Sequence, residues 1–467
     1  MAPASPRSDA LRVFAIAWAI AVLFDFGSIH RWDRSVYDFA LLVATFATLF
    51  RGGAVIPLVC MAGLQVITVA GRAPVVSNHW FFMGLVNIGL VVAYLLLALR
   101  ARRWRVDEND LMRWFAPAGR VGLVVLYFYV VFHKLNPDFM NPDVSAGALF
   151  WTAQKEVLPF LPVDHRGVMF GLYTTIIAEA AIPIFLCFGR TRWLGLLIGL
   201  VFHFFVGLSP LGRFWDFSSP IYAMYALFLP EGVLSSWREM LARWREHPLF
   251  VRLSSVAFEY QLFAIVGVGM LFMVFFISPA ARTLNQAPFR YFWMLYGPAF
   301  TVFALAGAWW SRERSLAGGF RMVHPLLWAS PALVVLNGMN PYLGLKTESS
   351  FAMFSNLQTE NGRSNHYLIP ASLQVFPFQK QCVEILHTTN PRLLSYAEEG
   401  RMLTLFELRV IAKHYPGGTA VIRYGEEEYR YENFRSDRDL LQPPNVLLSK
   451  YLRFRAFYVD GHSGNWH

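Results

Sequence analysis

Long apolar runs recur along this 467-residue chain, and they constrain its fold more than any other feature. Residues 80–99 and 168–188, for example, each approach or exceed the ~20 residues that a helix needs to cross a bilayer. Lipid offers no partner for backbone polar groups, so such runs are expected to be helices. Charged residues make up only 15% of the chain, well below the roughly 25% of soluble domains. We therefore predict a multipass α-helical membrane bundle.

Eleven candidate spans can be counted, and three of them are short for a bilayer. The short ones are residues 38–50, 219–230 and 325–337. The others are residues 11–29, 54–71, 80–99, 115–132, 168–188, 193–208, 257–277 and 289–310. The expected number of spans is therefore about nine to eleven. The first run lacks a convincing small-residue cleavage site, so we interpret it as a retained span.

The charges of the loops predict the orientation of the chain. Arginine clusters fall at residues 100–105, 190–192, 238–252 and 312–321, in loops that share one side of the membrane. Cytoplasmic loops carry an excess of Lys and Arg, so this side and the N-terminus are expected in the cytoplasm, with the C-terminus outside. The net charge of +10 comes mostly from such loops, which favours membrane orientation over nucleic-acid binding.

The composition changes after about residue 345. Short strands are expected at residues 382–386, 419–424 and 428–431, a turn at Gly417-Gly418, and a helix over residues 402–413. We therefore divide the chain into a membrane bundle, residues 1–340, and a small external α+β domain, residues 341–467. The segment 350–355 either folds back over the outer mouth of the bundle or is a plain linker.

Several ionisable residues lie inside apolar runs, where each must face the interior of the bundle, a wet cavity or a partner. Glu179 is a candidate site residue because Pro183, one turn later, frees a backbone group and indicates a polar interior. His203 is a second candidate, with a hydrogen-bonded interior histidine as the alternative. Arg120 and Glu259 lie near the ends of their runs and are expected to snorkel or pair, and Asp25 is expected to make a structural hydrogen bond.

Two motifs fall at the external ends of spans. Asn78-His79 opens one apolar run, and the next one ends in Phe132-His133-Lys134-Leu135-Asn136-Pro137-Asp138-Phe139. In a helical bundle both motifs could converge on one cavity near the outer face. Desolvation there would favour the neutral amine of Lys134, which could then act as a base. The alternative is an interfacial lysine that snorkels beside an exposed histidine.

The order of these motifs resembles the HTTM family, which includes the vitamin K-dependent gamma-carboxylases and their bacterial relatives. The matching features are Asn78-His79, Lys134-Leu135-Asn136-Pro137-Asp138, the span with Glu179, Phe202-His203 and Trp215-Asp216-Phe217. The resemblance covers residues 11–230 well and the rest more loosely. It implies a bacterial inner-membrane location.

The resemblance also implies roles for these residues. Lys134 would be the base that deprotonates reduced vitamin K or a related naphthoquinol, and Asn78 and His79 would hydrogen-bond the reacting oxygen. In the carboxylases, oxygen then turns the quinol into a base strong enough to take a proton from a peptide glutamate, and carbon dioxide is added. Glu179, His203 and Phe82 are assigned to the quinone site, and no metal is predicted.

A flat naphthoquinone with an isoprenoid tail requires an aromatic cavity that opens sideways to the bilayer. Phe81, Phe82, Trp151 and Phe214 are available to line it. The resemblance implies a membrane quinol or lipid and an external peptide or protein substrate as partners, and no nucleic acid is expected.

Three functional alternatives stay open. The first is quinol oxidation without carboxylation, because the external domain is shorter than the domain with which animal carboxylases hold their peptide substrate. A non-catalytic protein that binds quinone or lipid and recruits a partner is another. A transporter is the weakest, because the chain contains no repeated halves.

Overall fold

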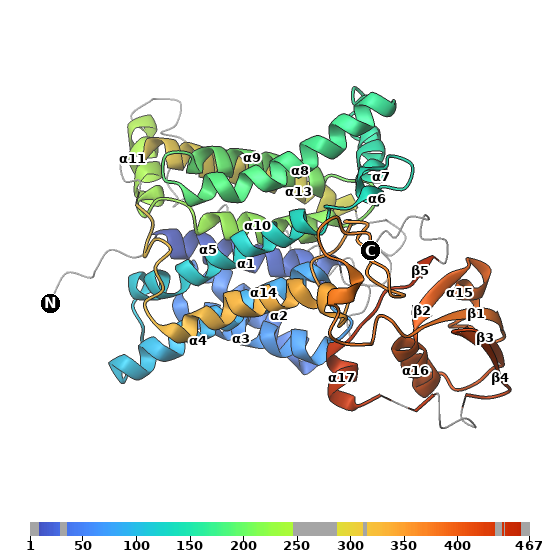
Figure 1. The fold of residues 1–467 in the computed structure, drawn as a ribbon. Helices are drawn as coiled ribbons and strands as arrows, with labels where there is room; N and C mark the ends of the chain where they lie inside the picture. Colours follow the sequence, from blue (N-terminus) through green and yellow to red (C-terminus); the bar gives the residue numbers. More distant parts are fainter. Residues whose placement is uncertain are drawn as a thin grey trace.

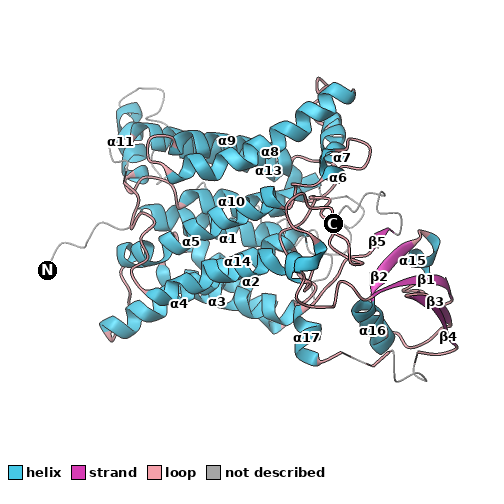
Figure 2. Ribbon diagram, in the orientation of Figure 1, coloured by secondary structure: helices cyan, strands magenta, loops and turns pink. Residues whose placement is uncertain are grey.

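The computed structural model describes residues 9–28, 35–245, 287–311, 315–434, 441–442 and 444–458. The candidate span at 257–277, Glu259 and parts of the arginine stretches 238–252 and 312–321 lie outside the described residues. Within the described part, a helical bundle carries a small sheet domain at one end (Figures 1 and 2).

The long helices of the bundle run roughly side by side (Figure 1). They are α1 (Asp9–Ser28), α2 (Val36–Phe50), α3 (Val55–Arg72), α4 (Asn78–Ala101), α5 (Glu108–Phe132), α8 (His165–Cys187), α9 (Arg192–Gly207), α10 (Phe214–Ala226), α13 (Ala287–Trp310) and α14 (Ala329–Leu343). Shorter helices lie at the two ends: α6 (Pro137–Met140), α7 (Ala146–Ala153), η1 (Gln154–Glu156), α11 (Val233–Arg245) and η3 (Pro325–Trp328).

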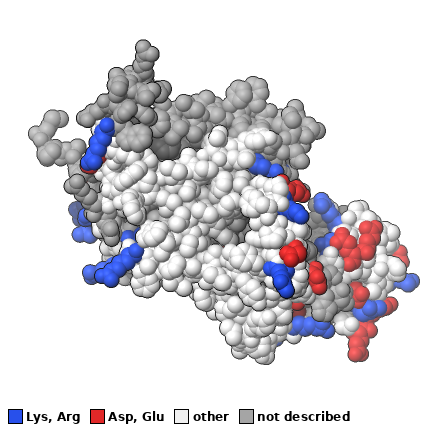
Figure 3. All heavy atoms as spheres, turned by 90° about the horizontal axis from the view of Figure 1, so that it is seen from above, with Lys and Arg blue, Asp and Glu red and all other residues white. Residues whose placement is uncertain are grey.

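Six of the described helices are long and apolar enough to cross a membrane: α1, α3, α4, α5, α8 and α13. The helices α2 and α9 are apolar but shorter. On the face drawn in Figure 3, charged side chains gather at the two ends of the bundle and on the sheet domain, and the surface between them carries almost none. These features support the prediction of a helical membrane protein, whereas the number of spans stays a prediction.

Helix α1 forms the centre of the bundle. Its sequence is apolar on all sides, which is typical of a buried helix. Nearly every residue from Ala10 to Phe26 is buried, and α1 packs against α2, α5, α10 and α11. Because α1 is surrounded, the polar groups it carries, such as Asp25, face other helices and not lipid.

Arg120, in the middle of α5, connects three parts of the bundle. Its side chain is fully buried. Nε donates to the carbonyl oxygen of Leu227 at 2.8 Å, and Nη1 donates to that of Ala317 at 2.8 Å and to that of Gly319. Arg120 thus holds the turn after α10 and the loop before η3. The expected snorkelling was wrong because the side chain is fully buried, and its hydrogen-bond partners are backbone carbonyl oxygens.

The sheet domain is a five-stranded antiparallel sheet in the order β4-β3-β1-β2-β5. Its strands are β1 (Cys382–Thr388), β2 (Arg401–Thr404), β3 (Ala420–Tyr424), β4 (Glu427–Tyr431) and β5 (Phe457–Tyr458). Its helices are η4 (Ala371–Leu373), α15 (Leu394–Glu398), α16 (Leu405–His414) and α17 (Val446–Tyr451). The first, third and fourth strands agree with the predicted ones.

The predicted helix over residues 402–413 was wrong at its start. Residues 402–404 belong to β2, where Met402 and Leu403 pair with Glu384 and Val383 of β1. The helix begins at Leu405, because the Thr404 side chain accepts a hydrogen bond from the Glu407 backbone N–H. Pairing with a distant strand therefore overrides the helical pattern of these residues.

Lys346 lies buried where the sheet domain meets the bundle. Its Nζ lies 4.1 Å from the ring centre of Phe81 on α4 and 5.1 Å from that of Tyr451 on α17. Burial lowers the pKa of this amine to about 7. Above pH 7 this amine is neutral in the folded chain, whereas it stays protonated in the unfolded chain up to the ordinary lysine pKa of about 10.4. The free energy of unfolding therefore rises with pH between these two values.

We expect the stability of the Lys346→Met variant to respond less to pH than that of the wild type. Between pH 7 and pH 9 the wild type should gain about 2 kcal/mol from this amine, and the variant should not. Thermal unfolding of the detergent-solubilised proteins at both pH values measures this difference. The exposed Lys413 supplies the control variant Lys413→Met, and an unchanged pH response in Lys346→Met would contradict the prediction.

Candidate functional site

A cavity of about 760 Å³ lies in the bundle at the end that carries the sheet domain. Its lining is mostly apolar and rich in aromatic rings: Phe82, Phe139, Phe150, Trp151, Phe160, Phe202, Phe205, Phe214, Phe217, Phe351 and Phe354. The polar residues in the lining are few: Asn78, His79, Lys134, Gln154, Thr174, Thr175 and Glu179. A large apolar pocket with a few convergent polar groups is typical of a site for a small hydrophobic molecule.

Glycines allow the wall of this cavity to close tightly. A Cβ added at Gly171 of α8 would lie 2.4 Å from a ring atom of Trp151, and one at Gly147 of α7 would lie 2.7 Å from Leu172. The short helix α7 therefore packs directly on α8, which brings the Trp151 ring into the lining.

Lys134 follows the end of α5 and turns into the cavity. Only 5% of the residue is exposed. Its Nζ donates a hydrogen bond to Oε2 of Glu179 on α8 and lies 5.6 Å from the ring centre of Phe139. The chain reverses directly after Lys134 because Asn136 caps α6 by accepting a hydrogen bond from the Phe139 backbone N–H at 2.8 Å. The alternative of a snorkelling lysine therefore does not apply.

Lys134 and Glu179 form a buried ion pair in the wall of the cavity. A buried pair of charges is costly in a low-dielectric site unless both partners are well bonded. Each partner therefore depends on the other to compensate its charge.

Asn78 is the first residue of α4, and its side chain holds a segment that covers the cavity. Its Oδ1 accepts a hydrogen bond from the Phe351 backbone N–H at 2.6 Å. We call residues 347–357 the cap segment, because its Phe351, Met353 and Phe354 form part of the cavity lining. The prediction that residues 350–355 fold back over the bundle thus agrees with the structure, and the linker alternative does not.

The cap segment has a strained backbone that is held by many hydrogen bonds. Ser349, Phe351, Phe354 and Asn356 all have positive φ values between 54° and 67°, a conformation that costs about 1–3 kcal/mol per residue and is found mostly at functional sites. The Asn356 side chain accepts from Ala146 N–H at 2.8 Å and donates to the Val144 carbonyl at 2.9 Å. These bonds fix the cap segment to the loop before α7 and to the start of α7.

His133, the neighbour of Lys134, points to the cap segment. Its Nδ1 lies 2.8 Å from the Tyr342 hydroxyl, and its Nε2 lies 3.2 Å from the Ser350 carbonyl oxygen. Burial lowers the pKa of this imidazole to about 3. His133 is therefore neutral at physiological pH and adds no positive charge beside Lys134.

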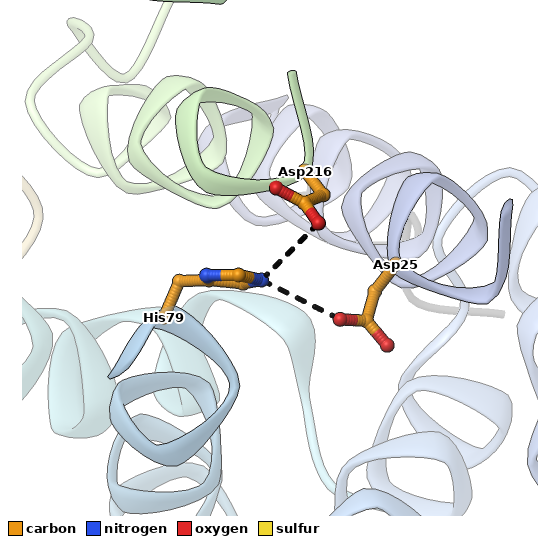
Figure 4. Close-up of side chains that lie close together, drawn as sticks. All are labelled: Asp25, His79 and Asp216. Carbon is orange, nitrogen blue, oxygen red and sulfur yellow. Dashed lines mark ion pairs between the residues drawn. The ribbon is translucent and has the colours of Figure 1, made fainter. Parts of the chain in front are cut away.

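His79, the second residue of α4, faces two carboxylates (Figure 4). Its Nε2 lies 3.5 Å from Oδ1 of Asp25 on α1 and 3.7 Å from Oδ2 of Asp216 on α10. Sequence reasoning missed this cluster: Asp25 was expected to make a structural hydrogen bond, and Asp216 appeared only within the Trp215-Asp216-Phe217 motif. The three residues lie on three separate helices, so no spacing in the sequence could have joined them.

Five of the six predicted site residues line the cavity: Asn78, His79, Phe82, Lys134 and Glu179. The sixth, His203, does not line it. Its Nε2 lies 2.7 Å from the hydroxyl of Tyr127, and its ring packs against that of Phe217, which does line the cavity. The alternative of a hydrogen-bonded interior histidine describes its position.

Two of the additional aromatic candidates, Trp151 and Phe214, are in the lining, whereas Phe81 packs against Lys346. Gln154 was not foreseen as a lining residue. It follows α7, and its Nε2 donates to the Phe205 carbonyl at 2.9 Å.

Comparisons with known proteins do not assign this chain to a family. No family model matches the chain, and no curated protein or solved structure matches it either. The resemblance to the HTTM family thus rests on the motifs quoted above, and the function must be argued from the cavity.

Proposed function

We propose that this chain is a membrane-embedded enzyme that resembles the vitamin K-dependent gamma-carboxylases and acts on a reduced naphthoquinone, with Lys134 as its base. One observation carries the proposal: the amine of Lys134 is buried against Glu179 in the wall of a large aromatic cavity. Burying a lysine inside a membrane protein is energetically unfavourable, so a lysine in such a position usually has a function. Deprotonating a bound hydroxyl group is a task that a neutral buried amine can perform.

The cavity suits a naphthoquinol in size and chemistry. Its volume of about 760 Å³ lies in the usual range for small-molecule sites, and its aromatic lining suits a flat ring. The lining residues Phe160, Val201 and Phe205 are also exposed at the surface. They favour an opening beside α9, through which an isoprenoid tail would reach lipid.

When bound, the quinol would supply a ring that molecular oxygen can oxidise. The side chains of this protein would prepare that step. Glu179 takes the proton of the Lys134 ammonium, and the resulting amine accepts a proton from the bound hydroxyl. Asn78 keeps its amide NH₂ for an oxygen of the ring while its Oδ1 holds the cap segment. The cap segment and the aromatic lining would exclude water from the reacting groups.

Carboxylation of a glutamate in an external peptide or protein is the further step that the resemblance implies. The cap segment lines the cavity, and the sheet domain lies at one end of the bundle (Figure 1). A peptide approaching from outside would meet them first. In this proposal the C-terminal domain is external and the membrane is the bacterial inner membrane.

A non-catalytic quinone or lipid carrier is the second candidate. The nearly uniform apolar lining of the cavity favours it, since such a surface would also hold an acyl chain. The two candidates differ in oxygen consumption, not in binding.

The test uses the purified full-length protein in nanodiscs with a reduced naphthoquinone. We expect saturable quenching of tryptophan fluorescence, oxygen consumption and formation of the quinone epoxide, followed by mass spectrometry. Binding without oxygen consumption would favour the carrier. Absence of both would refute both candidates.

A further inference from the structure

We propose that Asp25, His79 and Asp216 bind one divalent metal ion of the manganese-to-zinc series at the edge of the cavity. This inference does not depend on the proposed function, because it concerns binding of an ion and not turnover of a quinol. It rests on the geometry of three side chains, on their burial and on their charges. Among the described residues, this group combines an imidazole and carboxylates close enough to share an ion.

The separations of the three ligand atoms are compatible with a shared ion. Nε2 of His79 lies 3.5 Å from Oδ1 of Asp25 and 3.7 Å from Oδ2 of Asp216, and the three ligand atoms lie within 4.8 Å of one another. The same Nε2 lies 3.2 Å from the Ser77 hydroxyl oxygen, and an ion bound to Nε2 would replace this contact. An ion bonded at about 2.0–2.2 Å holds its ligand atoms about 3–4 Å apart. The three side chains would need to move only slightly closer together to bind an ion.

The three side chains come from rigid elements. Asp25 lies on the buried helix α1, His79 in the first turn of α4, and Asp216 in the first turn of α10. Figure 4 shows the three side chains converging from these helices on one point. A site built on packed helices keeps its ligands in place better than one built on loops.

The charged side chains of this cluster lie in a largely buried environment. Asp25 is 3% exposed and His79 is 8% exposed, and buried carboxylates are stabilised by nearby positive charge. Arg72 lies near Asp25. Arg213, which precedes α10, lies near Asp216. A divalent ion would place its charge between the two carboxylates.

The donor set indicates which ion fits. Imidazole nitrogen with carboxylate oxygen suits Mn²⁺, Fe²⁺ or Zn²⁺, whereas Ca²⁺ and Mg²⁺ prefer oxygen ligands alone and Cu⁺ prefers sulfur. Three protein ligands leave at least one coordination position for water or another oxygen. Because His79 also lines the cavity, that position would be available to a polar group of a molecule bound there.

The experiment measures metal in the full-length protein in detergent. The protein is stripped with a chelator, loaded separately with Mn²⁺, Zn²⁺ or, without oxygen, Fe²⁺, and desalted before mass spectrometry of the metal. We expect about one ion per chain in the wild type and at least about tenfold less in Asp216→Asn and Asp25→Asn. The exposed Asp143 provides the matched control, because Asp143→Asn also removes one carboxylate and should keep the ion.

A second readout separates loss of the site from loss of the fold. The ion should raise the melting temperature of the wild type and of Asp143→Asn, but not that of Asp216→Asn. If Asp25→Asn does not fold, Asp216→Asn decides alone, since the Asp216 side chain, at 14% exposed, is the most accessible of the three. The proposal is overturned if none of the three ions is retained by the wild type, or if Asp216→Asn retains as much as the wild type.

The outcome is independent of the quinol assay. Metal retention without quinol turnover would support this site and count against the proposed reaction. Turnover by a wild-type protein that retains no ion after reloading would support the reaction and overturn the site. The cluster would then be a histidine held between two carboxylates.

Discussion

Replacing Lys134 by arginine is expected to lower naphthoquinol epoxidation by about 10²–10⁴-fold, the usual contribution of a positioned base. Arginine keeps the positive charge beside Glu179, so the buried pair persists. Its guanidinium, however, stays protonated in proteins and cannot accept the proton of a bound hydroxyl. Epoxide formation and oxygen consumption in nanodiscs measure the loss, and quenching of tryptophan fluorescence shows whether the quinol still binds.

Lys134→Met is the companion variant, because it removes the amine itself. It leaves Glu179 buried without its partner, and an uncompensated charge of this kind costs about 3–5 kcal/mol. The double variant Lys134→Met/Glu179→Leu should recover most of this stability without recovering activity. Wild-type epoxidation in either Lys134→Arg or the double variant would remove this amine from the mechanism.

Replacing Arg120 by leucine is expected to lower the free energy of unfolding by about 3–5 kcal/mol. Three backbone carbonyl oxygens, those of Leu227, Ala317 and Gly319, lose their donor, and water cannot replace it in the buried interior. The effect should appear as a lower melting temperature of the detergent-solubilised protein, with the helical content at low temperature preserved.

The exposed Arg113, on the same helix, gives the matched control. Its replacement by leucine should change stability by less than about 0.5 kcal/mol. Equal destabilisation by Arg120→Leu and Arg113→Leu would show that the buried hydrogen bonds of Arg120 contribute little.

The long helices could be predicted because their signal is local. The apolar run at residues 80–99 is α4, which extends two residues further at each end. Helix α5 begins at Glu108, earlier than the predicted residue 115, because Asp107 caps it by accepting from the backbone N–H groups of Asn109 and Asp110. The cap residue was present in the sequence, but a search for apolar runs excludes the polar first turn.

The short elements depended more on tertiary structure. The predicted span at residues 325–337 is the short helix η3 followed by α14, which continues to Leu343 and ends where Gly344 adopts a φ of 79°. Strands β2 and β5 were not predicted. They pair with each other far apart in sequence, and β5 has only two residues, so neither carries a pattern of its own.

In the candidate site, too, local features could be predicted from the sequence and contacts between helices could not. That Asn78-His79 and Lys134 stand at helix ends on one side of the bundle follows from the sequence, because apolar runs and their polar ends are local signals. The contacts of Lys134 with Glu179, of Asn78 with the cap segment, and of His79 with Asp25 and Asp216 arise from the packing of helices that are distant in sequence. Hydropathy sets where a helix begins and ends, whereas side-chain packing between helices sets which of its faces meets which neighbour.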